Sequence, residues 1–101
     1  MLIRIVRMYF QADKVQDFLE VFENSKHLIR HFAGCKHLEL WQDANFPNVF
    51  CTYSHWESEA HLENYRNSEL FRTTWAKTKP LFEKKPYAFS VRLNQVVSNP
   101  Q

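Results

Sequence analysis

The sequence predicts a ferredoxin-like α+β domain with an antiparallel sheet and the element order β-α-β-β-α-β. A strand pattern comes before the first helical pattern, and two strand patterns joined by a short turn follow it. A second helical region then leads into a last strand pattern. The 101 residues include one glycine and 16% aromatic residues, enough bulky side chains for one independent core. We expect a single domain over residues 1–96 and a flexible tail over residues 97–101.

The first strand and the first helix have separate signals. Residues 2–10 are rich in Ile, Val, Tyr and Phe, which favours a strand. Asp13 and Gln16 have the spacing of a capping box, which predicts a helix start. Apolar side chains then recur at helical spacing, so we expect a helix over residues 14–32 that ends near Gly34.

The segments 35–42 and 49–56 predict a hairpin, with Pro47 confined to the turn. Pairing about this turn places Cys35 opposite about residue 57 and Cys51 opposite about residue 41, so a disulfide between them is not expected. One face would be the helix-covered core and would carry Leu38, Leu40, Phe50, Thr52, Ser54 and Trp56. The other face would carry His37, Glu39, Trp41, Cys51, Tyr53 and His55.

The second helical region is expected to consist of two short helices. Ser58 and Ser68 are both suited to the N-cap position, and the helical pattern breaks near Asn67. The last strand is expected over residues 87–96.

Charge and composition exclude several classes of partner. Thirteen Lys and Arg residues against eleven Asp and Glu residues give a net charge of +2, and the positive charges are dispersed, which does not favour a nucleic-acid partner. No apolar run is long enough to span a membrane, and the N-terminus has a strand pattern, so we expect a cytoplasmic protein without a membrane partner. A single glycine excludes a glycine-rich phosphate loop.

Four short segments occur in a characteristic order: Asp13-Lys14-Val15-Gln16-Asp17-Phe18, Phe32-Ala33-Gly34-Cys35, Trp56-Glu57-Ser58 and Ser68-Glu69-Leu70-Phe71. With this order and spacing, residues 2–91 resemble the antibiotic biosynthesis monooxygenase family of dimeric α+β barrels. Members of that family are typically homodimers whose open sheets pack face to face, with a pocket between sheet and helices in each subunit. Some oxidise quinols or aromatic polyketides with molecular oxygen and use neither metal nor flavin.

The resemblance implies a cofactor-independent monooxygenase that acts, as a homodimer, on a small aromatic or quinol-like compound. The alternative is a non-catalytic small-molecule-binding or structural dimer of the same fold. One branch of the family degrades haem with an asparagine, a tryptophan and a histidine at positions that correspond here to Val6, Tyr65 and Trp75. All three depart from that pattern and no axial ligand stands at Trp75, so haem degradation is not expected.

Four residues are candidate substrate contacts: Arg4, Trp56, Tyr65 and Trp75. The aromatic residues would line a flat slot, and the hydroxyl of Tyr65 would orient or protonate a planar substrate. Arg4 would stabilise a phenolate or enolate anion, or else hold its head in water at the sheet edge. The sequence leaves open whether the aromatic residues line a pocket or fill a solid core, and it identifies no catalytic residue.

Histidines give two further patterns. His37, Glu39 and His55 share one predicted sheet face, where a polar cross-strand cluster is the expected role and a metal site the alternative. His27 and His31 lie four residues apart, on the expected solvent face near a helix C-terminus. The helix dipole favours a partly protonated histidine at that end, so the pair needs no metal to explain it. We therefore expect neither a metal site nor a cofactor.

Overall fold

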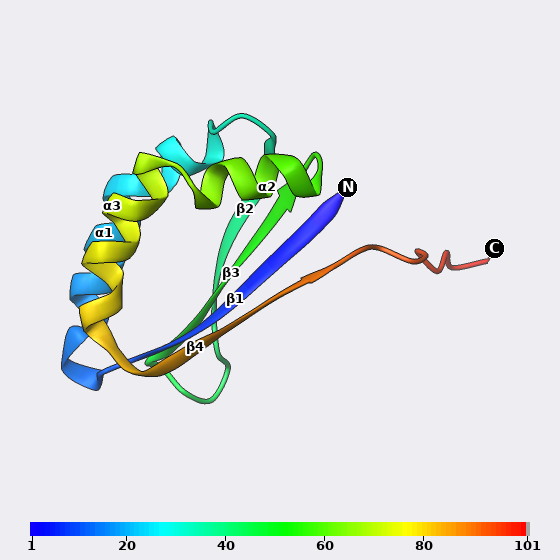
Figure 1. The fold of residues 1–101 in the computed structure, drawn as a ribbon. Helices are drawn as coiled ribbons and strands as arrows, with labels where there is room; N and C mark the ends of the chain where they lie inside the picture. The colour runs from blue at the N-terminus through cyan, green and yellow to red at the C-terminus, as the bar shows by residue number, and fades with distance from the viewer. Residues whose placement is uncertain (101) are drawn as a thin grey trace.

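The computed structural model describes residues 1–100, and their elements follow the predicted order (Figure 1). They are β1 (Leu2–Phe10), η1 (Ala12–Lys14), α1 (Val15–Arg30), β2 (Cys35–Gln42), β3 (Val49–Trp56), α2 (Glu59–Arg66), α3 (Glu69–Thr78), η2 (Lys79–Leu81) and β4 (Phe82–Val91). The four strands form one antiparallel sheet in the order β2-β3-β1-β4, which is the ferredoxin-like arrangement.

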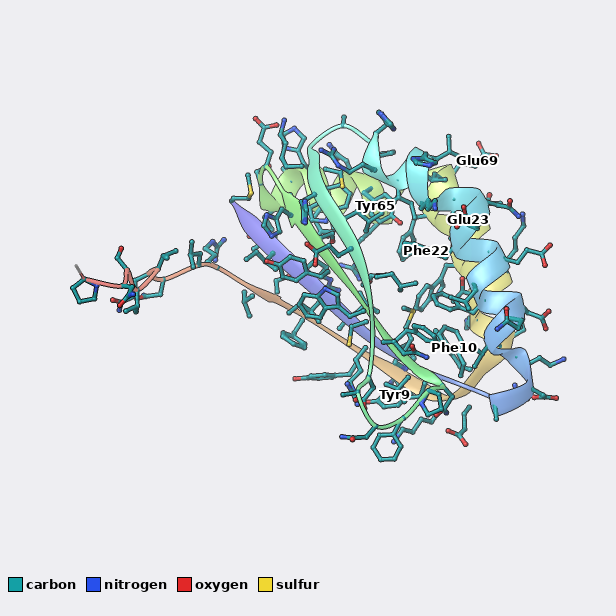
Figure 2. The ribbon with its side chains drawn as sticks, turned by 180° about the vertical axis from the view of Figure 1, so that it is seen from behind. Tyr9, Phe10, Phe22, Glu23, Tyr65 and Glu69 are labelled. Carbon is teal, nitrogen blue, oxygen red and sulfur yellow. The ribbon has the colours of Figure 1, made fainter. Side chains whose placement is uncertain are left out.

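The helices all lie on one side of the sheet, and no described element covers the other side (Figure 1). Two buried clusters connect the layers. One gathers Leu2, Cys35, Trp56 and Leu62 beneath α2, and the other gathers Met8, Phe10, Phe18 and Phe50 beneath the start of α1. Figure 2 shows Phe10, Phe22 and Tyr65 in the space between sheet and helices. Within the described residues, no helix is both long and apolar enough to span a membrane.

The hairpin has the predicted register, with Trp41 opposite Cys51. A register shift between Cys35 and His37 places Cys35 opposite Trp56, and the shift turns the Cys35 side chain into the core beneath α2. Both cysteines are free, as expected from their separation along the hairpin.

The helix starts differ in how they are capped. Ser58 and Ser68 act as N-caps, since their hydroxyls accept hydrogen bonds from the backbone N–H groups of His61 and Phe71. The capping box predicted at Asp13 is wrong, because the chain enters α1 through the η1 turn and neither element has a side-chain cap. The end of α1 falls two residues before the predicted position, and Gly34 has the positive φ of +90° expected after a helix.

The last strand was predicted over residues 87–96, and this is wrong: β4 starts at Phe82 and ends at Val91. Pro86 lies inside the strand because β4 is at the sheet edge, where a missing N–H is tolerated. The pairing of β4 with β1 is also irregular between Arg7 and Tyr9, opposite this segment. Residues 92–100 form no helix or strand and extend away from the domain body (Figure 1).

Candidate functional site

A cavity of about 290 Å³ lies between the sheet and the helices and is partly open to solvent. All four strands and the helices α1, α2 and α3 contribute to its lining, which is mostly apolar. The four candidate substrate contacts named from the sequence, Arg4, Trp56, Tyr65 and Trp75, all line this one cavity. The space between the layers is therefore not a solid core throughout.

Trp56 forms a rigid wall of the cavity. Its side chain is 1% exposed and stacks on Tyr65, with the ring centroids 4.9 Å apart and the planes inclined by 25°. The indole N–H donates a hydrogen bond to Ser54 Oγ at 2.9 Å, which satisfies the only polar atom of the side chain. Trp56 thus reaches the cavity with little of its apolar surface, and it offers a ligand no free hydrogen bond.

From Trp56 a row of aromatic rings continues along the helices. The Tyr65 ring meets Phe71 edge to face at 5.2 Å, Phe71 stacks on Trp75 at 5.7 Å, and Trp75 meets Phe82 at 5.5 Å. Phe71 lines the cavity but was not among the sequence candidates. Its spacing of four residues from Trp75 on α3 was the available signal, since residues at i and i+4 share a helix face.

Tyr65 contributes a neutral phenol. Burial raises the pKa of Tyr65 above its usual value near 10, and a negative charge on the Cys35 thiol would raise it further. The hydroxyl therefore keeps its proton at physiological pH, and it can serve as a hydrogen-bond donor but not as a base.

Two arginines supply positive charge to the cavity lining, Arg4 from β1 and Arg66 from the last turn of α2. Arg4 is half-buried, and its Nη1 donates a hydrogen bond to Ser90 Oγ at 3.2 Å. Burial and the positive charge of Arg66 lower the pKa of Arg4, while Glu63 raises it. Arg66 forms an ion pair with Glu63 at 3.4 Å. Arg66 was not among the sequence candidates, although it lies four residues after buried Leu62 on the same helix face.

The uncovered face of the sheet carries the polar cluster predicted from the hairpin. His37 bonds Glu39, Trp41 donates its indole N–H to the second Glu39 oxygen at 2.7 Å, and His55 Nε2 lies 2.8 Å from the Tyr53 hydroxyl. Trp41 also stacks on Tyr53 at 4.5 Å. Within residues 1–100 no set of three His, Cys, Asp or Glu side chains is arranged to hold a metal ion. The hydrogen bonds of the cluster join side chains two residues apart on one strand, and ring contacts such as Trp41 on Tyr53 connect the two strands.

His27 and His31 are joined by a hydrogen bond at the C-terminal end of α1. His31 Nδ1 lies 2.7 Å from the backbone oxygen of His27, and because a carbonyl oxygen only accepts, Nδ1 carries the proton of this bond. The ring is thereby a second donor to the His27 carbonyl, which also accepts the backbone N–H of His31 at 3.0 Å.

Comparison with known proteins adds the family relationship. A family model described as antibiotic biosynthesis monooxygenase matches residues 1–77 of the chain. No curated protein matches the chain significantly.

Solved structures match nearly the whole chain. A protein from Nitrosomonas europaea that carries the same family name has a TM-score of 0.87 at 15% identity and covers 94% of this chain and 100% of its own. Rv0793 from Mycobacterium tuberculosis has a TM-score of 0.86 at 15% identity, with coverages of 96% and 98%. PA3566 from Pseudomonas aeruginosa has a TM-score of 0.80 at 22% identity, with coverages of 91% and 93%. At these identities the similarity shows a shared fold.

Proposed function

The chain belongs to the antibiotic biosynthesis monooxygenase family, and we propose that it is a cofactor-independent monooxygenase for a small aromatic or quinol-like compound. The observation that supports this proposal is the cavity, which combines flat aromatic walls with the guanidinium of Arg4. Its volume of about 290 Å³ is at the small end of the range for ligand pockets. A compound of one or two fused rings therefore suits it better than a polycyclic one.

The chemistry we propose depends on a substrate anion. Neither a carboxylate, a histidine, a lysine nor a cysteine is among the lining residues, so the proton of the substrate leaves to water. The positive charge of Arg4 lowers the pKa of a bound phenol or enol and so favours this loss. Tyr65 remains protonated and acts only as a donor toward the substrate.

The anion then reacts with molecular oxygen. It gives its electrons to O₂, and a ring carbon that bears two hydrogens in the keto form bonds to one oxygen atom. The resulting peroxide takes up a proton, the O–O bond breaks, and water leaves with the remaining hydrogen of that carbon. The carbon becomes a carbonyl group, so one oxygen atom enters the product, the other enters water, and the substrate supplies all the electrons.

We further propose that the protein is a homodimer in which a second copy covers the open face of the sheet. Large apolar side chains stand exposed on this face, among them Tyr87 at 62%, Val91 at 41% and Trp41 at 41%. Tyr87 also packs beside Phe89 on β4, with ring centroids 5.3 Å apart. An aromatic sheet face of this kind is the type of surface that soluble proteins cover with a partner.

Oxygen uptake by the metal-free protein, measured across a panel of quinols and hydroxynaphthalenes, would test the proposed activity. We expect uptake above the autoxidation rate with at least one compound, and a decrease of about tenfold or more in Arg4→Gln and in Trp75→Leu. Arg7→Gln is the matched control, since Arg7 lies on the same strand but outside the cavity lining, and it should keep the wild-type rate. Wild-type uptake no faster than autoxidation with every compound would contradict the proposal.

The absence of a base from the cavity lining favours a second candidate, a non-catalytic small-molecule-binding dimer. This candidate predicts that a ligand quenches the fluorescence of Trp56 or Trp75 while no oxygen is consumed. Fluorescence titration and oxygen uptake on the same compounds separate the two functions.

A further inference from the structure

One part of the cavity lining has a positive charge that the lining does not balance. Among the described residues that line it, Arg4 and Arg66 are the only charged ones, and the others are apolar or carry a neutral hydroxyl or indole N–H. Glu63 pairs with Arg66 at 3.4 Å, but its side chain is 57% exposed and does not line the cavity. Two cations therefore face one partly solvated carboxylate.

We propose that Arg4 and Arg66 form a carboxylate-binding subsite and that the substrate class is an aromatic carboxylate. The inference deepens the proposed function and rests on it for the reaction, although binding can be measured without turnover. The ring would lie along Tyr65, Phe71 and Trp75, which line the same cavity, and the carboxylate would sit at the arginines.

The hydrogen-bonding capacity of Arg4 supports this assignment. A guanidinium has five N–H donors, and among residues 1–100 the Arg4 side chain donates only to Ser90 Oγ, a neutral partner. The remaining donors of this half-buried guanidinium are available to an anionic ligand. A carboxylate can accept two parallel bonds from one guanidinium, which makes it a geometrically suitable ligand.

Arg66 is the weaker of the two anchors. Its Nη1 already interacts with Glu63, which neutralises part of its charge. It is also more exposed than Arg4, so water screens its interactions more strongly. We therefore expect Arg4 to contribute more to carboxylate binding than Arg66.

Position along the chain links the two parts of the site. Arg66 directly follows Tyr65 on α2, and Tyr65 begins the row of rings that runs through Phe71 to Trp75. The site thus has a cationic end and an aromatic wall. A planar compound with a carboxylate at one end matches both parts. A neutral quinol brings no carboxylate to the arginines.

The experiment compares an aromatic acid with its uncharged ester. Calorimetric titration of the purified full chain with 2-naphthoate and with methyl 2-naphthoate measures the contribution of the carboxylate, since the ring is unchanged. We expect the acid to bind at least tenfold more tightly than the ester. Arg4→Gln should abolish this preference, Arg66→Gln should reduce it, and Arg4→Lys should keep part of it because the charge remains.

Arg7→Gln is the control for this titration, because it removes a guanidinium of the same strand that does not line the cavity. It should keep the preference for the acid. Circular dichroism of each variant verifies that it is folded before its affinities are compared.

Three outcomes would overturn the subsite: wild-type affinities that are equal for acid and ester, no binding of the acid, or a preference that survives both Arg4→Gln and Arg66→Gln. The proposed oxygenase can fail independently. Oxygen uptake with neutral quinols but no preference for the acid removes only the subsite. A clear preference for the acid without uptake on any hydroxylated analogue removes only the oxygenase.

Discussion

Arg4 and Arg7 lie three residues apart on β1 and point to opposite faces of the sheet. The two arginines differ in the partners that surround them. On the uncovered face, Arg7 donates to Asp43 at 2.8 Å and to the Tyr9 hydroxyl at 3.1 Å, and the bond to Asp43 raises the pKa of Arg7. On the cavity face, burial lowers the pKa of Arg4, and among residues 1–100 its one side-chain hydrogen bond is to Ser90. The protein neutralises one arginine by itself and leaves the other available to a ligand.

The same contrast extends to the two faces as a whole. The uncovered face carries polar aromatic side chains that stack on one another, as Trp41 and Tyr53 do, and whose polar atoms bond to neighbours on their own strands. The covered face combines a buried cluster around Phe10 with the cavity beside Trp56, and Met8 and Phe18 belong to both. Alternation of side chains along four short strands thus places hydrogen-bonded polar side chains on one face of the sheet and a cavity of ligand size on the other.

The largest expected effect separates the tryptophans of the two faces. Trp56→Ala should lower the free energy of unfolding by about 3–5 kcal/mol, because it removes a fully buried side chain and enlarges the cavity. Trp41→Ala should lower it by less than about 1 kcal/mol at low protein concentration, because Trp41 is exposed. Urea denaturation measures both, and similar losses would contradict the assignment of the two faces.

Self-association should depend on the uncovered face. Tyr87→Glu places a charge in the proposed interface and should weaken dimerisation by about tenfold or more. Leu28→Glu is the control, since Leu28 is 61% exposed on α1 of the helix layer, the opposite side of the domain. Sedimentation velocity over a range of concentrations compares the two variants. A monomeric wild type, or a dimer unaffected by Tyr87→Glu, would exclude this interface.

The Arg7–Asp43 pair should make stability depend on pH at the acidic end. The Asp43 carboxylate accepts a hydrogen bond from Arg7 and two from backbone N–H groups, and these bonds hold the pKa of Asp43 below its usual value near 3.8. A lowered pKa stabilises the fold above pH 3.8, and this contribution is lost as pH falls through the pKa of the folded state. The urea midpoints of wild type and Asp43→Asn should differ at pH 7 and converge below pH 3.8. A difference that is independent of pH would refute this account.

The smallest expected effect concerns Arg4 itself. Without ligand, Arg4→Gln should change the free energy of unfolding by less than about 0.5 kcal/mol, since it removes no ion pair within the protein. Arg7→Gln should lower the thermal midpoint, because it leaves Asp43 without its cationic partner. Differential scanning calorimetry compares the two variants. A greater loss in Arg4→Gln would show that Arg4 has a structural role.

Strand alternation made much of this arrangement predictable from the sequence. Parity, a local property, placed Arg4 on the same face as Val6, while Trp56, Tyr65 and Trp75 were grouped through the positions that the family resemblance singles out. Arg66 was missed because its approach to the cavity depends on how α2 ends before the turn at Asn67, and that geometry comes from tertiary packing.

Two predictions of secondary structure were wrong for similar reasons. The start of β4 was missed because Pro86 argues against a strand unless the strand is known to be at an edge, and edge position is decided by pairing with β1. The capping box at Asp13 failed because the same residues also suit a turn, and the backbone of η1 took that alternative.

The irregular edge formed by β4 has a consequence for how copies of the protein meet. Lys84, Lys85 and Pro86 follow one another at its shifted register, so the edge presents charge and an interrupted row of N–H groups to an approaching strand. Such an edge is a poor template for strand addition, the route by which sheets polymerise into fibrils. The β4 edge therefore does not compete with the sheet face that we propose as the dimer interface, and a face that pairs with itself about a twofold axis closes at two subunits.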